Sequence, residues 1–234
     1  MMKIKLTLLA TCTVVYSMGV SDSFAAILAA WNFNLLSITT ASAPGRGGAP
    51  TTIAASSGTG TVGLDGWGGL VDDFAGSTVN QIGSDPAEES LSLVSGVASG
   101  GLFPGNGTFM TISFSMLGYE DLVVTYAHRG TTTGFNSGGW SWSTDGVTFT
   151  ALSGGPIPTT SEAFTLATAS FAAVTGVDNN NTVTLRYTLS GATSNSGNNR
   201  IDNLQISATA IPEPDPVVLL GALGTLVLVR RRNR

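Results

Sequence analysis

The chain has 234 residues, of which 42% are hydrophobic and only 11% are charged, against about 25% charged residues in a typical soluble protein. Its 30 glycines, 30 threonines and 25 serines exceed a third of the sequence, which disfavours helix bundles, coiled coils and most doubly wound α/β enzymes, since these need Ala, Leu, Glu and Lys on helix faces. One histidine and one cysteine leave almost no chemistry that depends on an imidazole or a thiolate.

The net charge of −5 is unevenly distributed. Residues 26–211 contain 12 acidic and 4 basic side chains and no lysine, so this region has a charge of −8. Nucleic-acid binding needs Lys and Arg to replace counterions along a row of phosphates. We therefore expect no nucleic-acid partner, and an anionic membrane surface is disfavoured for the same reason.

Residues 1–25 predict a secretory signal peptide with a helical apolar segment. A basic start precedes an apolar stretch over residues 6–20, and small side chains at Ser23 and Ala25 favour cleavage between Ala25 and Ala26. The alternative is a retained membrane helix, for which an apolar stretch of roughly 15 residues is short. Cleavage would leave a mature chain without cysteine and hence without disulfides.

Residues 26–210 predict an all-β domain, namely a jelly-roll-like antiparallel β-sandwich. Short strand-like runs alternate there with Gly, Asn, Ser and Pro, and about 185 residues suit two sheets of four or more strands. Helix is expected at most near residues 86–89, and residues 41–60 are expected to form a long surface loop. The expected strands cover residues 27–33, 108–116, 122–127, 140–143, 147–152, 163–168, 171–175, 182–189 and 201–208.

Asp145 and Gly146, between two alternating segments, predict a tight hairpin, because glycine accepts the positive φ that such turns require. This hairpin resembles those common in concanavalin-like and jelly-roll domains of secreted bacterial proteins. The closing strand over residues 200–206 carries the same resemblance.

The sequence favours a protein without catalytic residues. His128, the only histidine, follows an apolar strand, and no Gly-x-Ser-x-Gly elbow occurs, so a structural role is favoured for it. A carboxylate pair for glycoside hydrolysis remains an alternative, although most of the acidic residues lie in polar segments where they are more simply solvating charges. The available carboxylates are Asp72, Asp73, Glu88, Glu89, Glu120 and Asp121.

Three tryptophans are candidates for stacking on sugar rings. Trp140 and Trp142 are two residues apart on one expected strand, so both project from the same face of a sheet. Ordinary sandwich alternation favours placing this pair in the core. Trp67, in a glycine-rich stretch, is therefore expected to be the exposed aromatic residue.

Calcium is a second binding hypothesis, drawn from the resemblance to jelly-roll modules, in which the ion often joins the first and last strands. Asn32, Asn34, Asp202 and Asn203 offer oxygen ligands at those places, and calcium requires oxygen donors. The same residue types are common turn formers at strand ends, so we predict no resident cofactor.

The C-terminus combines three features. Pro212, Glu213 and Pro214 belong to a proline-rich segment that cannot form helix or ladder hydrogen bonds and is expected to stand clear of the domain. Residues 217–229 are uncharged and would rise about 20 Å as a single membrane helix, which spans a bilayer only marginally. A basic cluster follows and is expected on the cytoplasmic side; it contains Arg230, Arg231, Arg232 and Arg234.

This tail resembles the PEP-CTERM sorting signal of Gram-negative bacteria, which an exosortase recognises. The resemblance covers residues 211–234, with the motif at Pro212 to Pro214, the helix at residues 217–229 and the basic end at Arg230 to Arg232. It implies a precursor held in the inner membrane, then processing and release to the cell surface or an exopolysaccharide matrix. An ordinary stop-transfer anchor is the alternative.

The sequence thus predicts three segments: a signal peptide (1–25), a β-sandwich (26–210) and a sorting and anchor segment (211–234). The predicted function is that of an exported, surface-sorted, non-enzymatic protein. A carbohydrate-binding module for extracellular polysaccharide is the alternative, followed by a polysaccharide-active enzyme.

Overall fold

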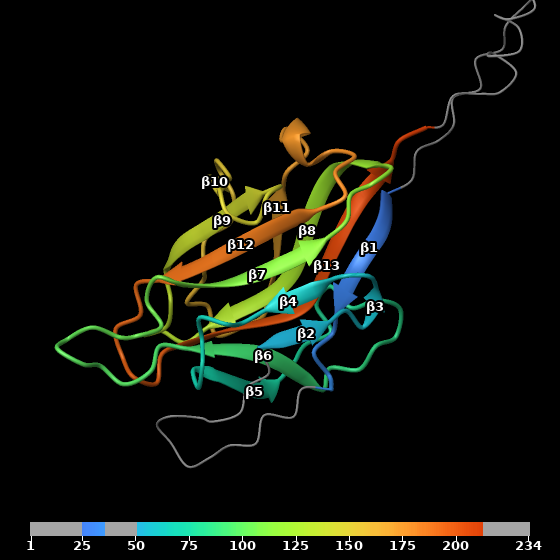
Figure 1. Cartoon of the computed structure of the whole chain (residues 1–234). Coiled ribbons are helices and arrows are strands. Elements are labelled where there is room, and N and C mark those ends of the chain that lie inside the picture. The colour runs from blue at the N-terminus through green and yellow to red at the C-terminus, as the bar shows by residue number, and fades with distance from the viewer. Residues whose placement is uncertain (1–24, 36–50, 213–234) are drawn as a thin grey trace, which may run out of the picture.

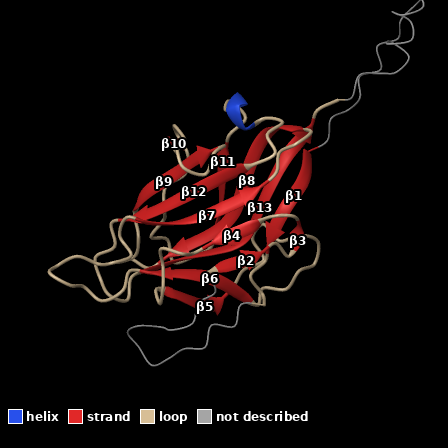
Figure 2. Cartoon of the chain, viewed as in Figure 1, coloured by secondary structure: helices blue, strands red, loops and turns tan. Residues whose placement is uncertain are grey.

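A computed structural model describes residues 25–35 and 51–212 of the chain (Figure 1). Within these ranges the protein is all-β, and its strands form two antiparallel sheets that pack face to face (Figure 2). The antiparallel β-sandwich predicted from the sequence is confirmed. The described part contains a single helical turn, η1 (Thr175–Val177), and no helix long and apolar enough to cross a membrane.

The first sheet is organised around its last strand, β13. Strand β8 pairs with one edge of β13, while the other edge pairs first with β6 and then with β1. Strands β11, β5 and β3 extend the sheet beyond β8, β6 and β1, respectively. The seven strands are β1 (Ala25–Trp31), β3 (Ser57–Gly58), β5 (Val71–Ala75), β6 (Glu89–Val94), β8 (Tyr119–Gly130), β11 (Thr165–Ser170) and β13 (Asn198–Ala210).

The second sheet has the order β10-β9-β12-β7-β4-β2. Its centre is the β7–β12–β9 ladder, which pairs without register shifts. The six strands are β2 (Thr52–Ala54), β4 (Thr61–Gly63), β7 (Thr108–Phe114), β9 (Ser137–Ser143), β10 (Thr150–Ala151) and β12 (Val183–Ser190).

Alternation along the strands places the core between the sheets. In β12, Leu185 and Tyr187 are buried, whereas Thr184 and Arg186 point to the outer face and are partly exposed. Tyr187 stacks on Trp140 of β9 with ring centroids 4.7 Å apart. The indole N–H of Trp140 donates to the hydroxyl of Tyr126 in β8 at 3.2 Å, so one hydrogen bond joins the two sheets inside the core.

The predicted hairpin at Asp145 is present and joins β9 to β10. Gly146 has a φ of 72°, the positive value expected of it. The backbone N–H groups of Thr148 and Val147 donate to Asp145 Oδ1 at 2.7 and 2.8 Å, and they hold the pKa of this carboxyl well below its usual range. The connection covers residues 144–149, so it is longer than a two-residue turn, and the strand expected at 147–152 is reduced to β10.

One other strand prediction was wrong. Residues 171–175 do not form a strand: Phe171 is fully buried, and its carbonyl accepts the N–H of Val174 in a turn that leads into η1. No helix forms near residues 86–89, where Glu89 instead begins β6. The predicted loop at 41–60 contains β2 and β3 in its described part.

The two ends of the described domain lie side by side. Ala25 pairs with Thr209 and Ala26 with Ala208, so β1 starts where β13 ends, as the blue and red strands of Figure 1 show. The predicted signal helix and the predicted C-terminal membrane helix lie outside the described residues.

Replacing Trp140 with alanine tests the core. The side chain is 2% exposed, stacks on Tyr187 and supplies the inter-sheet hydrogen bond to Tyr126. We expect Trp140→Ala to lower the free energy of unfolding by about 3–5 kcal/mol, measured by urea denaturation. Val147→Ala, at a position 79% exposed, is the matched control and should change it by less than about 0.5 kcal/mol.

Candidate functional site

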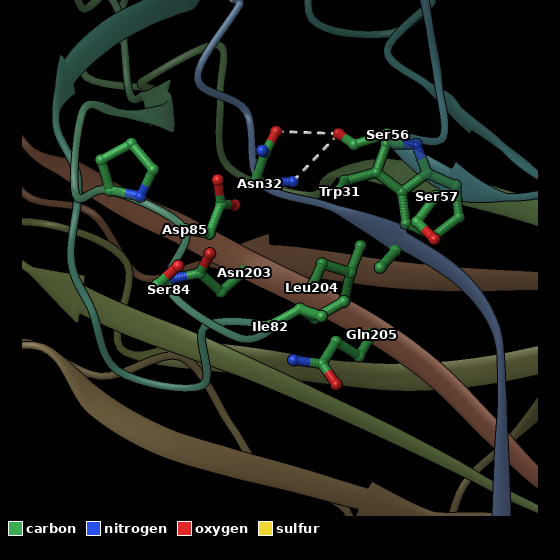
Figure 3. Close-up of a pocket in the computed structure, with 12 residues that line it drawn as sticks. Trp31, Asn32, Ser56, Ser57, Ile82, Ser84, Asp85, Asn203, Leu204 and Gln205 are labelled. Atoms are coloured by element: carbon green, nitrogen blue, oxygen red, sulfur yellow. Dashed lines mark hydrogen bonds between the residues drawn. The ribbon is translucent and has the colours of Figure 1, made fainter.

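A pocket of ≈410 Å³ with a mixed polar and apolar lining lies on the outer face of the first sheet. Its floor includes one cross-strand row, Ser57 of β3, Ala30 of β1 and Gln205 of β13, which are register partners. The segment from Ile82 to Pro86 closes the other side (Figure 3). The remaining lining residues are Trp31, Asn32, Ser56, Ser84, Asp85, Asn203 and Leu204.

One wall of the pocket depends on a bulge in β13. The register with β8 shifts between Asp202 and Gln205, and Asn203 takes a φ of 48°, a left-handed conformation that asparagine tolerates better than most residues. The Asn203 side chain donates to the carbonyls of Ser77 (2.7 Å) and Val79 (2.9 Å). These bonds dock the loop after β5 onto the sheet and position the segment that closes the pocket.

Asn32, directly after β1, lines the opposite wall, and Asn34 supports that wall from outside the lining. Asn32 Oδ1 accepts the hydroxyl of Ser56 at 2.8 Å, as the dashed line in Figure 3 marks. Asn34 donates from Nδ2 to Asp85 Oδ1 at 3.4 Å and to the carbonyl of Pro86 at 3.0 Å. In Figure 3, Asp85 lies between Asn32 and Asn203, so residues from distant parts of the sequence surround one opening.

The lining suits a small, neutral, hydroxyl-rich ligand. Side-chain amides and hydroxyls can both donate and accept, as sugar hydroxyls do. Asp85 is the only charged residue in the lining, and Ile82, which is 42% exposed, offers an apolar contact. The volume of ≈410 Å³ lies within the range usual for small-molecule sites.

Asp202 directly precedes Asn203 of the pocket lining and is 1% exposed. Burial raises its pKa to about 7, and the negative charge of Asp85 contributes a smaller increase. The N–H groups of Ser77 (2.7 Å) and Asn203 (2.8 Å) donate to its two oxygens and oppose the increase. The Asp202 carboxyl therefore anchors the loop after β5, although burial makes its charged form less favourable.

The structure brings together the four residues proposed for calcium. Asn32 and Asn203 line the pocket, Asn34 bonds to Asp85, and Asp202 lies next to Asn203. In the arrangement described, however, both Asp202 oxygens and Asn32 Oδ1 accept hydrogen bonds from protein groups. The described ranges contain no group of three or more His, Cys, Asp or Glu side chains that could hold a metal ion, and the calcium hypothesis stays a prediction.

The tryptophans lie differently from the arrangement that sugar stacking requires. Trp140 belongs to the core, as favoured by the alternation, and Trp142 is half-buried and packs against the core. The expectation that Trp67 is exposed was wrong: it is 1% exposed and meets Phe135 edge-to-face at 5.8 Å. Its glycine-rich neighbours indicated a loop, but they did not reveal that the loop folds its indole inward.

The catalytic candidates are dispersed. His128 projects into the core beside Tyr126, with ring centroids 5.4 Å apart, and burial lowers its pKa. Asp72 and Asp73 lie in β5, Glu88 and Glu89 at the start of β6, and Glu120 and Asp121 in β8. The pKa of Glu89 is raised by desolvation and by the neighbouring charges of Asp73 and Glu88. Glu120 and Asp121 belong to a strand that does not pair with β5 or β6.

Only the first residue of the predicted sorting motif lies in the described chain. Ile211 donates its N–H to the carbonyl of Gly118 at 2.9 Å, so the chain at Ile211 is held by the sandwich, contrary to the expectation that it stands clear. Pro212 lines a hollow beside Leu117 and Tyr119. Glu213, Pro214, Arg230, Arg231 and Arg232 lie outside the described residues.

Sequence reasoning did not identify Ser56, Ile82, Asp85 or Gln205 as site residues. Each is an ordinary loop or strand residue in sequence. The pairing of β3, β1 and β13 brings Ser56 and Gln205 together, and the docking of the loop between β5 and β6 adds Ile82 and Asp85. The one available signal was the presence of Asn32 and Asn203 near the ends of the first and last expected strands.

Comparisons with known proteins give little further information. No protein-family model matches the sequence, and no curated protein matches it. Among solved structures, the N-terminal CBM22-1–CBM22-2 tandem domain of Xyn10C from Paenibacillus barcinonensis is similar at 11% identity and a TM-score of 0.42, over 84% of this chain and 49% of that chain. The CBM22-1–GH10 modules of Clostridium thermocellum xylanase 10B, complexed with xylohexaose, match at 11% identity and a TM-score of 0.33, over 65% of this chain and 28% of that chain.

This chain therefore spans half or less of the length of each of these two solved structures. Likenesses of this size do not establish a shared function.

The buried carboxyl of Asp202 predicts how stability depends on pH. Because its pKa is about 7 in the folded protein and 3.8 without the protein environment, the folded state holds a proton between about pH 4 and 7 that the unfolded chain has released. Stability should therefore fall as pH rises through this window, by at most about 4 kcal/mol. Denaturation at pH 5 and pH 8 measures the difference.

Asp202→Asn should flatten this pH dependence, since the amide does not titrate. Glu162→Gln, which changes an exposed carboxylate, is the control and should leave it intact. An Asp202→Asn variant with the wild-type pH dependence would assign the effect to another group.

Proposed function

We propose that the chain is an exported, non-enzymatic β-sandwich of jelly-roll type that binds a saccharide in the pocket between β1, β13 and residues 82–86. The observation that carries the proposal is the lining of this pocket: amides and hydroxyls around an apolar contact at Ile82, with Asp85 as the only charge. Such a set can satisfy several sugar hydroxyls at once. The proposed ligand is one or two units of an extracellular polysaccharide.

The absence of catalysis is part of the proposal. It is supported by the placement of His128 in the core, away from the pocket, and by a pocket that holds one carboxylate where glycoside hydrolysis uses two. The competing hypothesis is a polysaccharide-active enzyme. Turnover of a polysaccharide that a single carboxylate substitution abolishes would favour that alternative.

For its location, we propose that the protein is a PEP-CTERM substrate. The supporting observation is the pairing of Ala26 with Ala208, which brings the predicted signal-cleavage site and the predicted sorting segment to one end of the sandwich. Residues 217–229 would hold the precursor in the inner membrane until an exosortase processes it. The body would then reach the cell surface or the exopolysaccharide matrix of a Gram-negative bacterium.

The pairing of β1 with β13 also constrains when the signal peptide can be cleaved. Ala25 and Ala26 lie inside β1, where both pair with β13, so a peptidase needs this bond before β1 closes onto the sheet. Of the described strands, β13 is the last to be translocated. We therefore propose that signal cleavage precedes completion of the first sheet.

Saccharide binding is tested with the full chain in detergent on a glycan array, followed by calorimetry with the best ligand. Ile82→Ala removes the apolar contact and Asp85→Asn removes the charged acceptor, and each should weaken binding by about tenfold. Val147 is exposed in the hairpin between β9 and β10 of the second sheet, so Val147→Ala should bind like the wild type. Binding that neither pocket variant weakens would refute the pocket as the site.

Processing is tested by intact-mass analysis of the protein from cells that contain an exosortase. We expect the wild type to lack the C-terminal helix and arginines, and Glu213→Ala to retain them because the motif is lost. If the wild-type protein keeps its chain through Arg234, the sorting proposal fails.

A further inference from the structure

The outer face of the second sheet carries an arginine held between two phenyl rings. The guanidinium carbon of Arg186 lies 3.5 Å from the ring centroid of Phe149 and 4.2 Å from that of Phe109. Both distances are well within the range of cation–π contact. This stack, formed by Phe109, Arg186 and Phe149, is called the arginine clamp below.

Strand register explains the position of the clamp. Phe109 in β7 pairs with Thr188, one diagonal step along β12 from Arg186, so it reaches the guanidinium from one side. Phe149 directly precedes β10 and reaches it from the β9 side, since Arg186 pairs with Ser141. The bonds of Asp145 Oδ1 to Val147 and Thr148 fix the loop that presents Phe149.

Arg186 has no anionic partner in the described part of the chain. Its register neighbours are Thr111 and Ser141, which are uncharged, and its Nε is buried without a hydrogen-bond acceptor. This is unusual because residues 26–211 contain 12 acidic side chains against 4 basic ones, so carboxylates are the commoner charge. The clamp therefore leaves a cation unpaired in an acidic domain.

Stacking determines which ligand the guanidinium can take. The ring of Phe109 approaches the guanidinium from the β7 side and that of Phe149 from the β9 side, and Nε is buried, so the terminal N–H groups remain for a ligand. Two such N–H groups match a carboxylate bidentately. The two rings also restrict the side chain before binding, which reduces the entropy that binding must remove. Around the clamp, Thr111, Ser113, Thr184, Thr188 and Ser141 form a hydroxyl-bearing strip on the same face.

We propose that the arginine clamp binds the carboxylate of a single uronic-acid unit in an otherwise largely neutral polysaccharide that lies across β7, β12 and β9. Carboxylate recognition follows from the unpaired edge of Arg186, and the neighbouring hydroxyls can bond to the sugar. The choice of a polysaccharide rests on the proposed function, but the clamp lies on the other sheet from the pocket and is a separate site.

The probe is a sparsely charged polygalacturonate in which most carboxylates are methyl esters, and its fully methyl-esterified form has the same backbone without the charge. Calorimetry with the full chain in detergent at low salt should show binding to the first polymer only, with an affinity that falls as salt is added. Arg186→Gln should weaken binding at least tenfold. Arg186→Lys should lose most of the affinity despite its charge, because an ammonium group cannot form the bidentate pair.

Arg129→Gln is the matched control. Arg129 also lies on an outer sheet face and near a phenyl ring, with its guanidinium carbon 5.7 Å from the Phe164 centroid, but it belongs to the first sheet. This variant should bind polygalacturonate like the wild type. Thermal melts of all variants show whether a loss of binding comes from a loss of fold; Arg186→Lys keeps the stacked cation and should melt like the wild type.

Three results would overturn the inference: no binding of polygalacturonate by the wild type, equal binding of the methyl ester, or unchanged binding by Arg186→Gln. Monomeric galacturonate that binds as tightly as the polymer would also contradict a site that extends across three strands. Ile82→Ala distinguishes the two proposals, since it should weaken binding in the pocket and leave polygalacturonate binding unchanged. Failure at the clamp therefore leaves the pocket proposal standing, and the reverse also holds.

Discussion

The ladder around β13 is the constraint on which the rest of this structure depends. A strand of 13 residues pairs along one edge with β8 and along the other with both β6 and β1, so it joins the beginning, middle and end of the described chain. These pairings are separated by long stretches of sequence and must all form before the sheet is complete. Because β13 comes last, the first sheet cannot close until nearly the whole domain is available.

The bulge in β13 connects this ladder to the candidate site. Asn203 at a φ of 48° directs its amide to the carbonyls of Ser77 and Val79, and Asp202 receives the N–H of Ser77, so the loop that bounds the pocket is tied to the strand. The cost is a buried carboxyl whose pKa is raised to about 7. Loop docking and the charge of Asp202 are therefore coupled, because the carboxyl that accepts the N–H of Ser77 is the one whose charged form burial disfavours.

The sequence was informative where one residue decides a local structure or where alternation is clean. The alternation over residues 108–116 predicted β7, and Asp145 with Gly146 predicted the hairpin. The sequence was uninformative where contacts between distant segments decide the local structure. Strand β3 has two residues and depends on its pairing with β1. The burial of Trp67 depends on packing partners such as Phe135, which is distant in sequence. The pocket and the arginine clamp fall in this second class, since each combines residues from strands whose register no local pattern specifies.

The positions of the two proposed sites have a geometric consequence. The pocket lies on the outer face of the first sheet, as its floor row Ser57, Ala30 and Gln205 shows, and the clamp lies on the outer face of the second. Two sheets with their shared core, about 10 Å from sheet to sheet, separate them. One straight segment of polysaccharide cannot contact both faces. A protein that uses both sites therefore holds two chains, or two distant parts of one chain, and so joins strands of a matrix, whereas a single continuous groove would only follow one of them.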